Sequence, residues 1–211
     1  MRSQPRPRLP KPLASSRFYE SISQVLRGLE PEQALQALVE STLPVPSRRQ
    51  QTAYTCGVAS LQAALEHFGI EPPSEERFAE LLGTTHEQGT SISAMAQAAQ
   101  ALGLQASIHQ GLTLDDLAHL TSQGVLPIVA YQAWPEASQK ASEAWKNSDD
   151  NGHYSIVRGV DEDRVTFMDP AVSRGGHRQL DQDEFLKVWH DIDSSSKPPK
   201  RLVRAALLLS V

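Results

Sequence analysis

Cys56 is the side chain that directs attention to a possible reaction, because it is the only cysteine among the 211 residues. Gly57 follows it, and apolar residues recur with helical spacing over 58–68, which predicts a helix starting near the cysteine. The N-terminal end of a helix has free N–H groups and a positive partial charge. These lower the pKa of a thiol and stabilise an oxyanion. Gln50, six positions earlier, offers an amide as a second oxyanion donor.

A thiol nucleophile also needs a base, and the best candidate opens a predicted β-hairpin. The β-rich segments 153–159 and 164–168 flank a short polar connector. A turn centred on Asp161 would place His153 directly opposite Asp169, on the same face, with Cβ atoms about 4.5–5.5 Å apart. A bulge would shift this pairing by one and is expected to put the two side chains on opposite faces.

Together these residues predict a Cys–His–Asp site for acyl transfer. A carboxylate bonded to one imidazole nitrogen leaves the other nitrogen to take a proton from a thiol. We therefore expect Asp169 to orient His153, and His153 to activate Cys56. Gln50 and the backbone N–H of Cys56 would form the oxyanion hole.

Less specific interpretations stand beside this one. A lone cysteine on an amphipathic helix is usually a small buried apolar residue. Gln51 is next to Gln50 and competes with it for the oxyanion role. A metal site among four polar residues of the C-terminal part is weakly supported, because helical His-x3-His spacing is missing. The four residues are His177, His190, Asp191 and Asp193. We expect no metal and no cofactor.

Composition excludes several classes of function. The net charge of −5 and a pI near 5.8 leave no basic excess to neutralise nucleic-acid phosphates. No apolar run approaches the roughly 18–20 residues that a membrane span needs. The basic N-terminus has no apolar core after it, so it is not a secretory signal. One cysteine is compatible with a reducing compartment, and we expect a cytoplasmic protein.

The chain divides into three predicted parts. Residues 1–16 are rich in proline and basic residues and are expected to be a disordered tail. Residues 17–43 carry two apolar stripes and predict a helical hairpin, and 44–211 form the main domain. The order of helices before mostly antiparallel strands predicts an α+β fold. The polar stretch 132–152 is a long loop of the kind that is often functional.

Within the main domain, capping and periodicity patterns place the individual elements. Helices are expected over 56–68, 74–82, 91–103 and 113–123, and from Asp181 after a capping-box pattern, with Phe185, Val188 and Trp189 inward. Strands are expected over 104–109, 125–131, 153–159, 164–168 and 202–211.

Three strings, Q-x5-C-G-V-A-S-L, G-H-Y-S-I-V-R-G-V and F-M-D-P, resemble the bacteriocin-processing cysteine peptidases that cleave double-glycine leaders. These are papain-like enzymes, often fused to peptide-exporting ABC transporters. The resemblance covers about 45–193 and implies a papain-like fold. Its spacing matches Gln50 rather than Gln51, and it implies catalytic roles for Cys56, His153 and Asp169. It further implies a peptide or leader-peptide substrate cut after Gly-Gly, and a free-standing member working with a separate exporter.

Three other functions remain open from the sequence. The same triad can serve amide or thioester hydrolysis, or transpeptidation, since all proceed through an acyl-enzyme. A catalytically silent relative would only bind a leader peptide. Finally, the helical hairpin of 17–43 would make the protein an interaction module, although its apolar stripes are expected to pack on the main domain.

Overall fold

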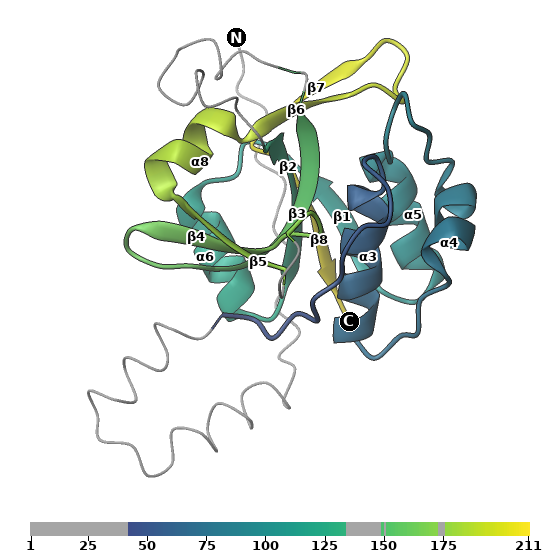
Figure 1. Cartoon of the computed structure of the whole chain (residues 1–211). Helices are drawn as coiled ribbons and strands as arrows, with labels where there is room; N and C mark the ends of the chain where they lie inside the picture. The colour runs from purple at the N-terminus through teal and green to yellow at the C-terminus, as the bar shows by residue number, and fades with distance from the viewer. Residues whose placement is uncertain (1–41, 134–148, 150, 173–175) are drawn as a thin grey trace, which may run out of the picture.

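The computed structural model describes residues 42–133, 149, 151–172 and 176–211 (Figure 1). The predicted tail of 1–16, nearly all of the predicted 17–43 hairpin and most of the 132–152 loop lie outside the described residues. Thr42 and Leu43, at the predicted end of that hairpin, belong to an irregular segment.

Helices and strands follow the predicted order closely. The helices of the described residues are α3 (Cys56–His67), α4 (Glu75–Leu82), α5 (Ile92–Ala101), α6 (Leu114–Ser122) and α8 (Gln182–Val188). The strands are β1 (Gln105–His109), β2 (Leu126–Gln132), β3 (Gly152–Val160), β4 (Arg164–Met168), β5 (His177–Asp181), β6 (His190–Asp193), β7 (Lys200–Val203) and β8 (Ala206–Ser210).

Six of these strands form one sheet in the order β1-β8-β2-β3-β4-β5, and all of its neighbours are antiparallel. The C-terminal strand β8 therefore lies inside the sheet, between β1 and β2. The strands β6 and β7 form a separate antiparallel pair. The predicted α+β class is confirmed.

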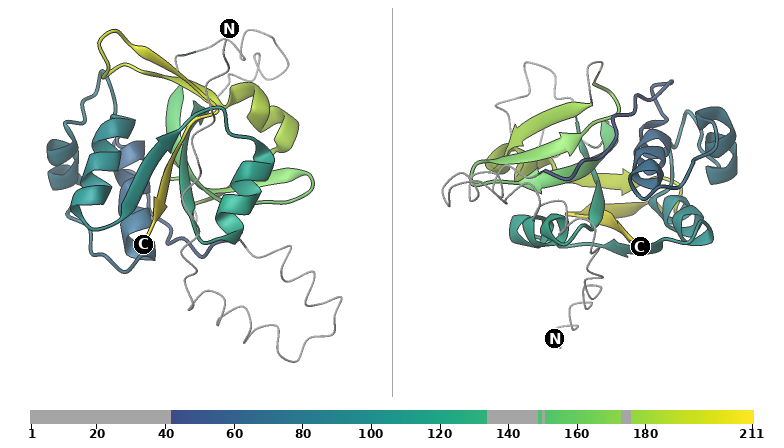
Figure 2. Two further views of the ribbon diagram at one scale, coloured as in Figure 1. Left: turned by 180° about the vertical axis from the view of Figure 1, so that it is seen from behind. Right: turned by 90° about the horizontal axis from the view of Figure 1, so that it is seen from below.

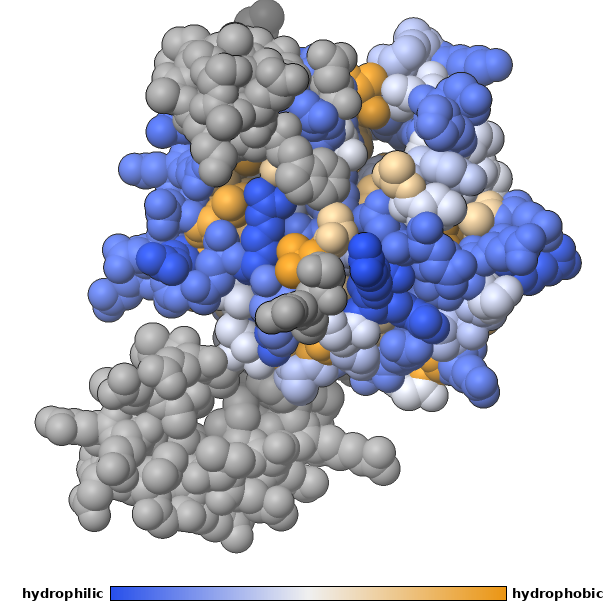
Figure 3. Space-filling view, viewed as in Figure 1, coloured by the Kyte–Doolittle hydropathy of each residue, from blue (hydrophilic) through white to orange (hydrophobic). Residues whose placement is uncertain are grey.

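Both faces of the sheet are covered by helices (Figures 1 and 2). On one face α3, α4 and α5 enclose a core that includes Leu61, Phe78 and Ile156. On the other face α6 and α8 enclose a second core that includes Tyr131 and Phe185. In Figure 3 hydrophilic side chains dominate the visible described surface, and hydrophobic ones form small separate patches. Burial of apolar area on two sides stabilises the sheet.

Helix starts confirm several sequence predictions. Ser74 accepts a hydrogen bond from the backbone N–H of Arg77 at the start of α4. Thr113 and Asp116 form a capping box at the predicted start of α6, each side chain bonding the other's backbone N–H. A glycine in the left-handed region, Gly83 at φ 64°, ends α4.

Three expectations for the C-terminal part are wrong. The predicted capping box of α8 does not form, because the side chain of Asp181 makes no capping hydrogen bond. The expected single strand over 202–211 is broken at Arg204, whose φ of 46° turns the chain between β7 and β8. The third difference is that β5 and β6 lie where no strand was expected.

The β3–β4 hairpin forms, but not in the predicted register. Val160 pairs with Val165 and Gly159 with Thr166, whereas beyond them Val157 pairs with Phe167. Arg158 has no partner in this ladder and is a β-bulge.

The bulge decides which face Asp169 occupies. Continued by one residue past its last pair, the ladder places Asp169 opposite Ser155, on the face that His153 also occupies. Without the extra residue, Asp169 would lie opposite Ile156, on the other face. The predicted direct pairing of His153 with Asp169 is therefore wrong. The expectation that a bulge would put the two side chains on opposite faces is also wrong, because the connector is not centred on Asp161.

Candidate active site

Cys56 is the first residue of α3, as the sequence predicted, and its side chain is 7% exposed. Gly57 allows this helix end to pack closely, since a Cβ there would lie 2.8 Å from Cβ of Thr90. The N-cap residue, Thr55, makes no side-chain capping bond, because its hydroxyl donates to Glu75 Oε1 at 2.6 Å. The positive end of the helix is thus left without a side-chain cap beside the thiol.

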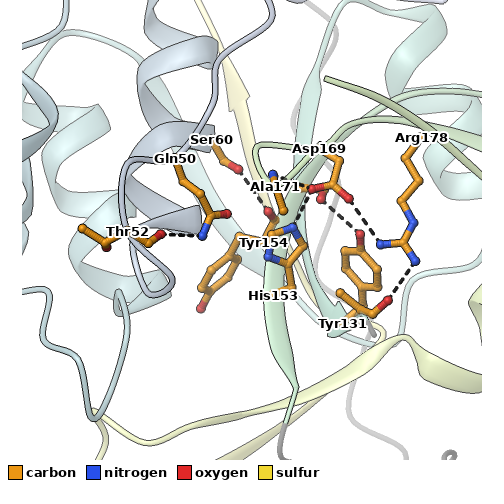
Figure 4. Close-up of polar contacts among 11 residues, drawn as sticks. Gln50, Thr52, Ser60, Tyr131, His153, Tyr154, Asp169, Ala171 and Arg178 are labelled. Carbon is orange, nitrogen blue, oxygen red and sulfur yellow. Dashed lines mark hydrogen bonds and ion pairs between the residues drawn. The ribbon is translucent and has the colours of Figure 1, made fainter. Parts of the chain in front are cut away.

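His153 and Asp169 meet as expected. His153 Nε2 lies 2.8 Å from Asp169 Oδ1, and the two side chains are 1% and 0% exposed (Figure 4). His153 is also within hydrogen-bonding reach of the Cys56 thiol. Because Nε2 faces the carboxylate, the nitrogen that faces the thiol is Nδ1. The structure therefore brings Cys56, His153 and Asp169 together.

The charges of these groups support each other. Burial by itself lowers the pKa of His153, but the Cys56 charge and hydrogen bonds to Asp169 and Cys56 outweigh burial and raise this pKa to about 9. For Asp169, burial acts to raise the pKa. The hydrogen bond and charge of His153, the Ala171 N–H and the charge of Arg178 reverse this and hold the pKa below its usual value. These contacts hold His153 in its protonated form beside the Cys56 thiol.

Two residues that sequence reasoning missed support this pair. Arg178 on β5 donates from Nη1 to Asp169 Oδ2 at 3.3 Å and from Nη2 to the carbonyl oxygen of Ala133 at 2.8 Å (Figure 4). The ring of Tyr131, opposite His153 in the β2–β3 ladder, packs edge-on against the imidazole at 5.7 Å between centroids. No sequence pattern indicated Arg178, which the pairing of β5 with β4 places opposite Phe167, near Asp169.

Gln50 lies next to this pair, whereas the side chain of Gln51 is exposed. The backbone N–H of Gln50 donates to the carbonyl oxygen of Pro170 at 3.0 Å, directly after Asp169. Its side-chain Nε2 donates to the carbonyl oxygen of Thr52 at 2.7 Å (Figure 4). One hydrogen of that amide is therefore used within the loop, which leaves a second one as the possible oxyanion donor.

The loop between Gln50 and Cys56 is held by Glu75 at the start of α4. Its Oε1 accepts hydrogen bonds from the backbone N–H of Gln51 at 2.7 Å and from the hydroxyl of Thr55. Glu75 is buried. One carboxylate oxygen thus fixes the loop that lies between the amide and the thiol.

A second buried carboxylate, Asp191 on β6, lies against the start of β3. A Cβ on Gly152 would lie 2.5 Å from Asp191 Oδ1, so only glycine fits directly before His153. Asp191 accepts hydrogen bonds from Gln132 Nε2 at 3.1 Å and from the backbone N–H of Ile192 at 2.8 Å. Burial nevertheless raises the pKa of Asp191 to about 7.

Among the described residues, no group of three or more His, Cys, Asp or Glu side chains has an arrangement that could hold a metal ion. In the same residues, no helix has the length and apolar character needed to cross a bilayer.

Comparison with known proteins agrees with this geometry. The sequence profile of the peptidase C39 family matches residues 45–193. The chain belongs to this family. An uncharacterized protein of Methanothermobacter marburgensis is 28% identical over 141 residues, covering 67% of this chain and 80% of the relative. Another, from Methanothermobacter thermautotrophicus, is 30% identical over 125 residues, covering 59% and 71%.

Solved structures of C39 peptidases share the fold. A C39-like peptidase from Bacillus anthracis aligns with a TM-score of 0.57 at 16% identity, covering 82% of this chain and 98% of that one. The peptidase domain of Streptococcus ComA, a bifunctional ABC transporter, gives 0.56 at 21% identity, covering 79% and 98%. A double glycine motif protease from an AMS/PCAT transporter, in complex with the leader peptide, gives 0.54 at 19%, covering 82% and 96%. The predicted papain-like C39 fold is confirmed.

Proposed function

We propose that this C39 family member is a cysteine peptidase that cuts a peptide bond after a Gly-Gly leader segment. The observation that carries the proposal is the buried His153–Asp169 hydrogen bond of 2.8 Å beside Cys56 at the start of α3. The nucleophile is Cys56, His153 is the acid and base, Asp169 orients His153, and Gln50 with the backbone N–H of Cys56 stabilises the oxyanion.

The reaction follows from the roles assigned to these groups. The Cys56 thiolate attacks the carbonyl carbon, and His153 protonates the leaving amine as the C–N bond breaks, which gives a thioester. Water then attacks the thioester while His153 accepts a proton, and the C–S bond breaks to release the acid. Asp169 holds the imidazole in one orientation through both steps.

The substrate class is supported by the family. The solved double glycine motif protease that shares this fold binds a leader peptide. Two glycines before the scissile bond carry only hydrogen on Cα, so the peptide backbone can approach a nucleophile that is only 7% exposed. A separate peptide exporter as partner and a cytoplasmic location complete the proposal.

The first experiment measures the thiol. Iodoacetamide labelling followed by mass spectrometry reports on Cys56 alone, because the chain has one cysteine. We expect rapid labelling near neutral pH and below, and loss of this low-pH reactivity in His153→Ala. His109→Ala is the matched control, since His109 is also a buried histidine. Wild-type labelling no faster than that of a free thiol would contradict activation of Cys56.

The second experiment identifies the reaction. Synthetic precursor peptides with Gly-Gly leaders, and matched peptides with Gly-Val at that position, are incubated with wild type, Cys56→Ala and Asp169→Asn. Cleavage by wild type after Gly-Gly alone is expected, with Asp169→Asn slower by about 10²- to 10⁴-fold. Tight binding without cleavage would instead support a silent leader-binding domain. Amide products with an added amine would support acyl transfer.

A further inference from the structure

The β-bulge at Arg158 is held by a residue far away in sequence. The backbone N–H of Leu43 donates to the carbonyl oxygen of Arg158 at 2.8 Å, and Nε of Arg158 donates back to the carbonyl oxygen of Leu43, also at 2.8 Å. A bulge leaves its extra residue outside the ladder. Leu43 thus pairs in both directions with the bulged residue, which has no partner in the β3–β4 ladder.

The surroundings favour this pairing. The side chain of Leu43 is buried in the core beneath α3. Gly159 leaves room for the segment, because a Cβ there would lie 3.2 Å from Cγ2 of Thr42. Arg158 also contacts the ring of His177 on β5. Leu43 therefore clamps the bulge through both the backbone and the side chain of Arg158, whereas His177 touches only the side chain of Arg158.

The same segment continues to the other candidate active-site residues. The carbonyl oxygen of Pro44 contacts His67 Nδ1 at 3.3 Å, at the end of α3. Arg48 forms an ion pair with Glu66 of α3 at 3.0 Å. Gln50 then bonds to Pro170 after β4. We call residues 42–50 the strap; it joins the helix that begins with Cys56 to the hairpin that carries His153 and Asp169.

We propose that Leu43 and Arg158 are positioning residues for the His153–Asp169 pair. Their reciprocal hydrogen bonds stabilise the bulge, and the bulge places Asp169 on the face of His153. This inference rests on the proposed function, because it assigns a role in the same site. Neither residue contacts the reacting atoms, so the effect reaches Cys56 only through the hairpin register.

The test removes the hydrogen bond from Arg158 Nε to the carbonyl oxygen of Leu43 in the full chain. Arg158→Met keeps the length of the side chain and loses the Nε–H donor. His177→Ala is the matched control, because it removes the other contact of Arg158 and leaves Leu43–Arg158 intact. The readout is the pH dependence of iodoacetamide labelling of Cys56, with the melting temperature measured in parallel.

We expect Arg158→Met to lose low-pH labelling by about 10- to 100-fold, towards the profile of His153→Ala, while His177→Ala keeps the wild-type profile. Arg158→Lys, which retains a donor, should recover part of the loss. A folded Arg158→Met protein with the wild-type profile would overturn the proposal. A wild-type profile without any low-pH reactivity would instead overturn the proposed function.

A second variant decides the matter if Arg158→Met does not fold. Gly159→Ala pushes a Cβ against Thr42 without removing any hydrogen-bond donor. A folded Gly159→Ala protein should show a smaller loss of low-pH labelling in the same direction. An unchanged profile in that variant, together with a melting temperature lowered relative to wild type, would mean that the strap only stabilises the fold.

Discussion

His153 and Asp169 are hydrogen-bonded although they are not opposite each other in the β3–β4 ladder. Asp169 continues the ladder opposite Ser155, two residues from His153, and both side chains occupy one face because of the bulge at Arg158. This diagonal placement lets the carboxylate reach Nε2 and leaves Nδ1 directed at Cys56.

Arg178 should tune this carboxylate. Arg178→Met removes the ion pair to Asp169 Oδ2 and raises the pKa of Asp169, because that positive charge helps to keep it low. Activity should fall by roughly tenfold at neutral pH, and the loss on acidification should begin at a higher pH than in wild type. Cleavage rates between pH 4 and 7 measure both effects.

Arg164→Met is the control for Arg178→Met, because Arg164 lies on the adjacent strand β4 with an exposed side chain. Arg164→Met should not change the pH at which the cleavage rate falls on acidification. Equal shifts in the two variants would show that general surface charge, rather than the contact with Asp169, controls the carboxylate.

The raised pKa of His153 predicts where activity is lost in alkaline solution. A histidine with a pKa of about 9 keeps its proton up to that pH, whereas an unperturbed histidine loses it near 6.5. Protonation of the leaving amine should therefore fail only as pH rises through about 9. NMR titration of the His153 ring should give the same midpoint.

Cys56→Ala supplies the comparison for that titration. Among the causes that raise the pKa of His153, the Cys56 charge is the largest, while burial continues to oppose protonation. The midpoint of the His153 ring should therefore move down in the variant. A midpoint that stays near 9 would assign the effect to Asp169 alone.

Much of this fold was predictable from local patterns, since capping residues such as Ser74 and Thr113 act within a few residues of the helix they start. The hairpin register was not. It depends on Leu43, whose contact with Arg158 spans 115 positions in sequence. The break at Arg204 also escaped, because only a positive φ and no glycine marks it.

The candidate site was also predictable only in part. Cys56, His153 and Asp169 are chemically distinctive residues at the ends of predictable elements. Arg178 and Glu75 act through partners from other elements, and no spacing rule links them to the cysteine. Charged residues are usually solvated, so only the fold reveals that these two are tied to the site.

We expect Glu75 to affect both stability and cleavage rate, although it lies outside the segment from Gln50 to Cys56. Glu75→Ala leaves the Gln51 N–H and the Thr55 hydroxyl without their acceptor. We expect a loss of about 1–3 kcal/mol in the free energy of unfolding. We also expect a decrease of about 10-fold or more in cleavage rate from misplacement of the loop. Chemical denaturation and cleavage assays measure the two effects.

Glu75→Gln retains a carbonyl oxygen that can accept both bonds, so it should keep most of the activity and stability. If Glu75→Gln is as damaged as Glu75→Ala, the negative charge matters and the hydrogen-bond argument is insufficient.

Gly152 and Asp191 should be energetically coupled. Gly152→Ala places a methyl group 2.5 Å from Asp191 Oδ1, a carboxylate held by Gln132 and by the backbone of Ile192. Overpacking of this kind costs about 1–3 kcal/mol, and it should also slow labelling of Cys56 because His153 follows directly.

Asp191→Ala in the Gly152→Ala background should relieve the clash, and the single Asp191→Ala variant completes a double-mutant cycle. Additive effects in urea denaturation would show that the two sites do not interact, contrary to the close approach seen at the start of β3.

The position of β8 has a consequence for synthesis of the protein. This strand follows every other described strand in the sequence but lies between β1 and β2, so the sheet has a gap until residues 206–210 have left the ribosome. Strands joined over such long separations pair slowly. A nascent chain therefore cannot complete the sheet that carries His153 and supports α3 until β8 has emerged, and we expect no reaction of the thiol with neighbouring peptides before that point.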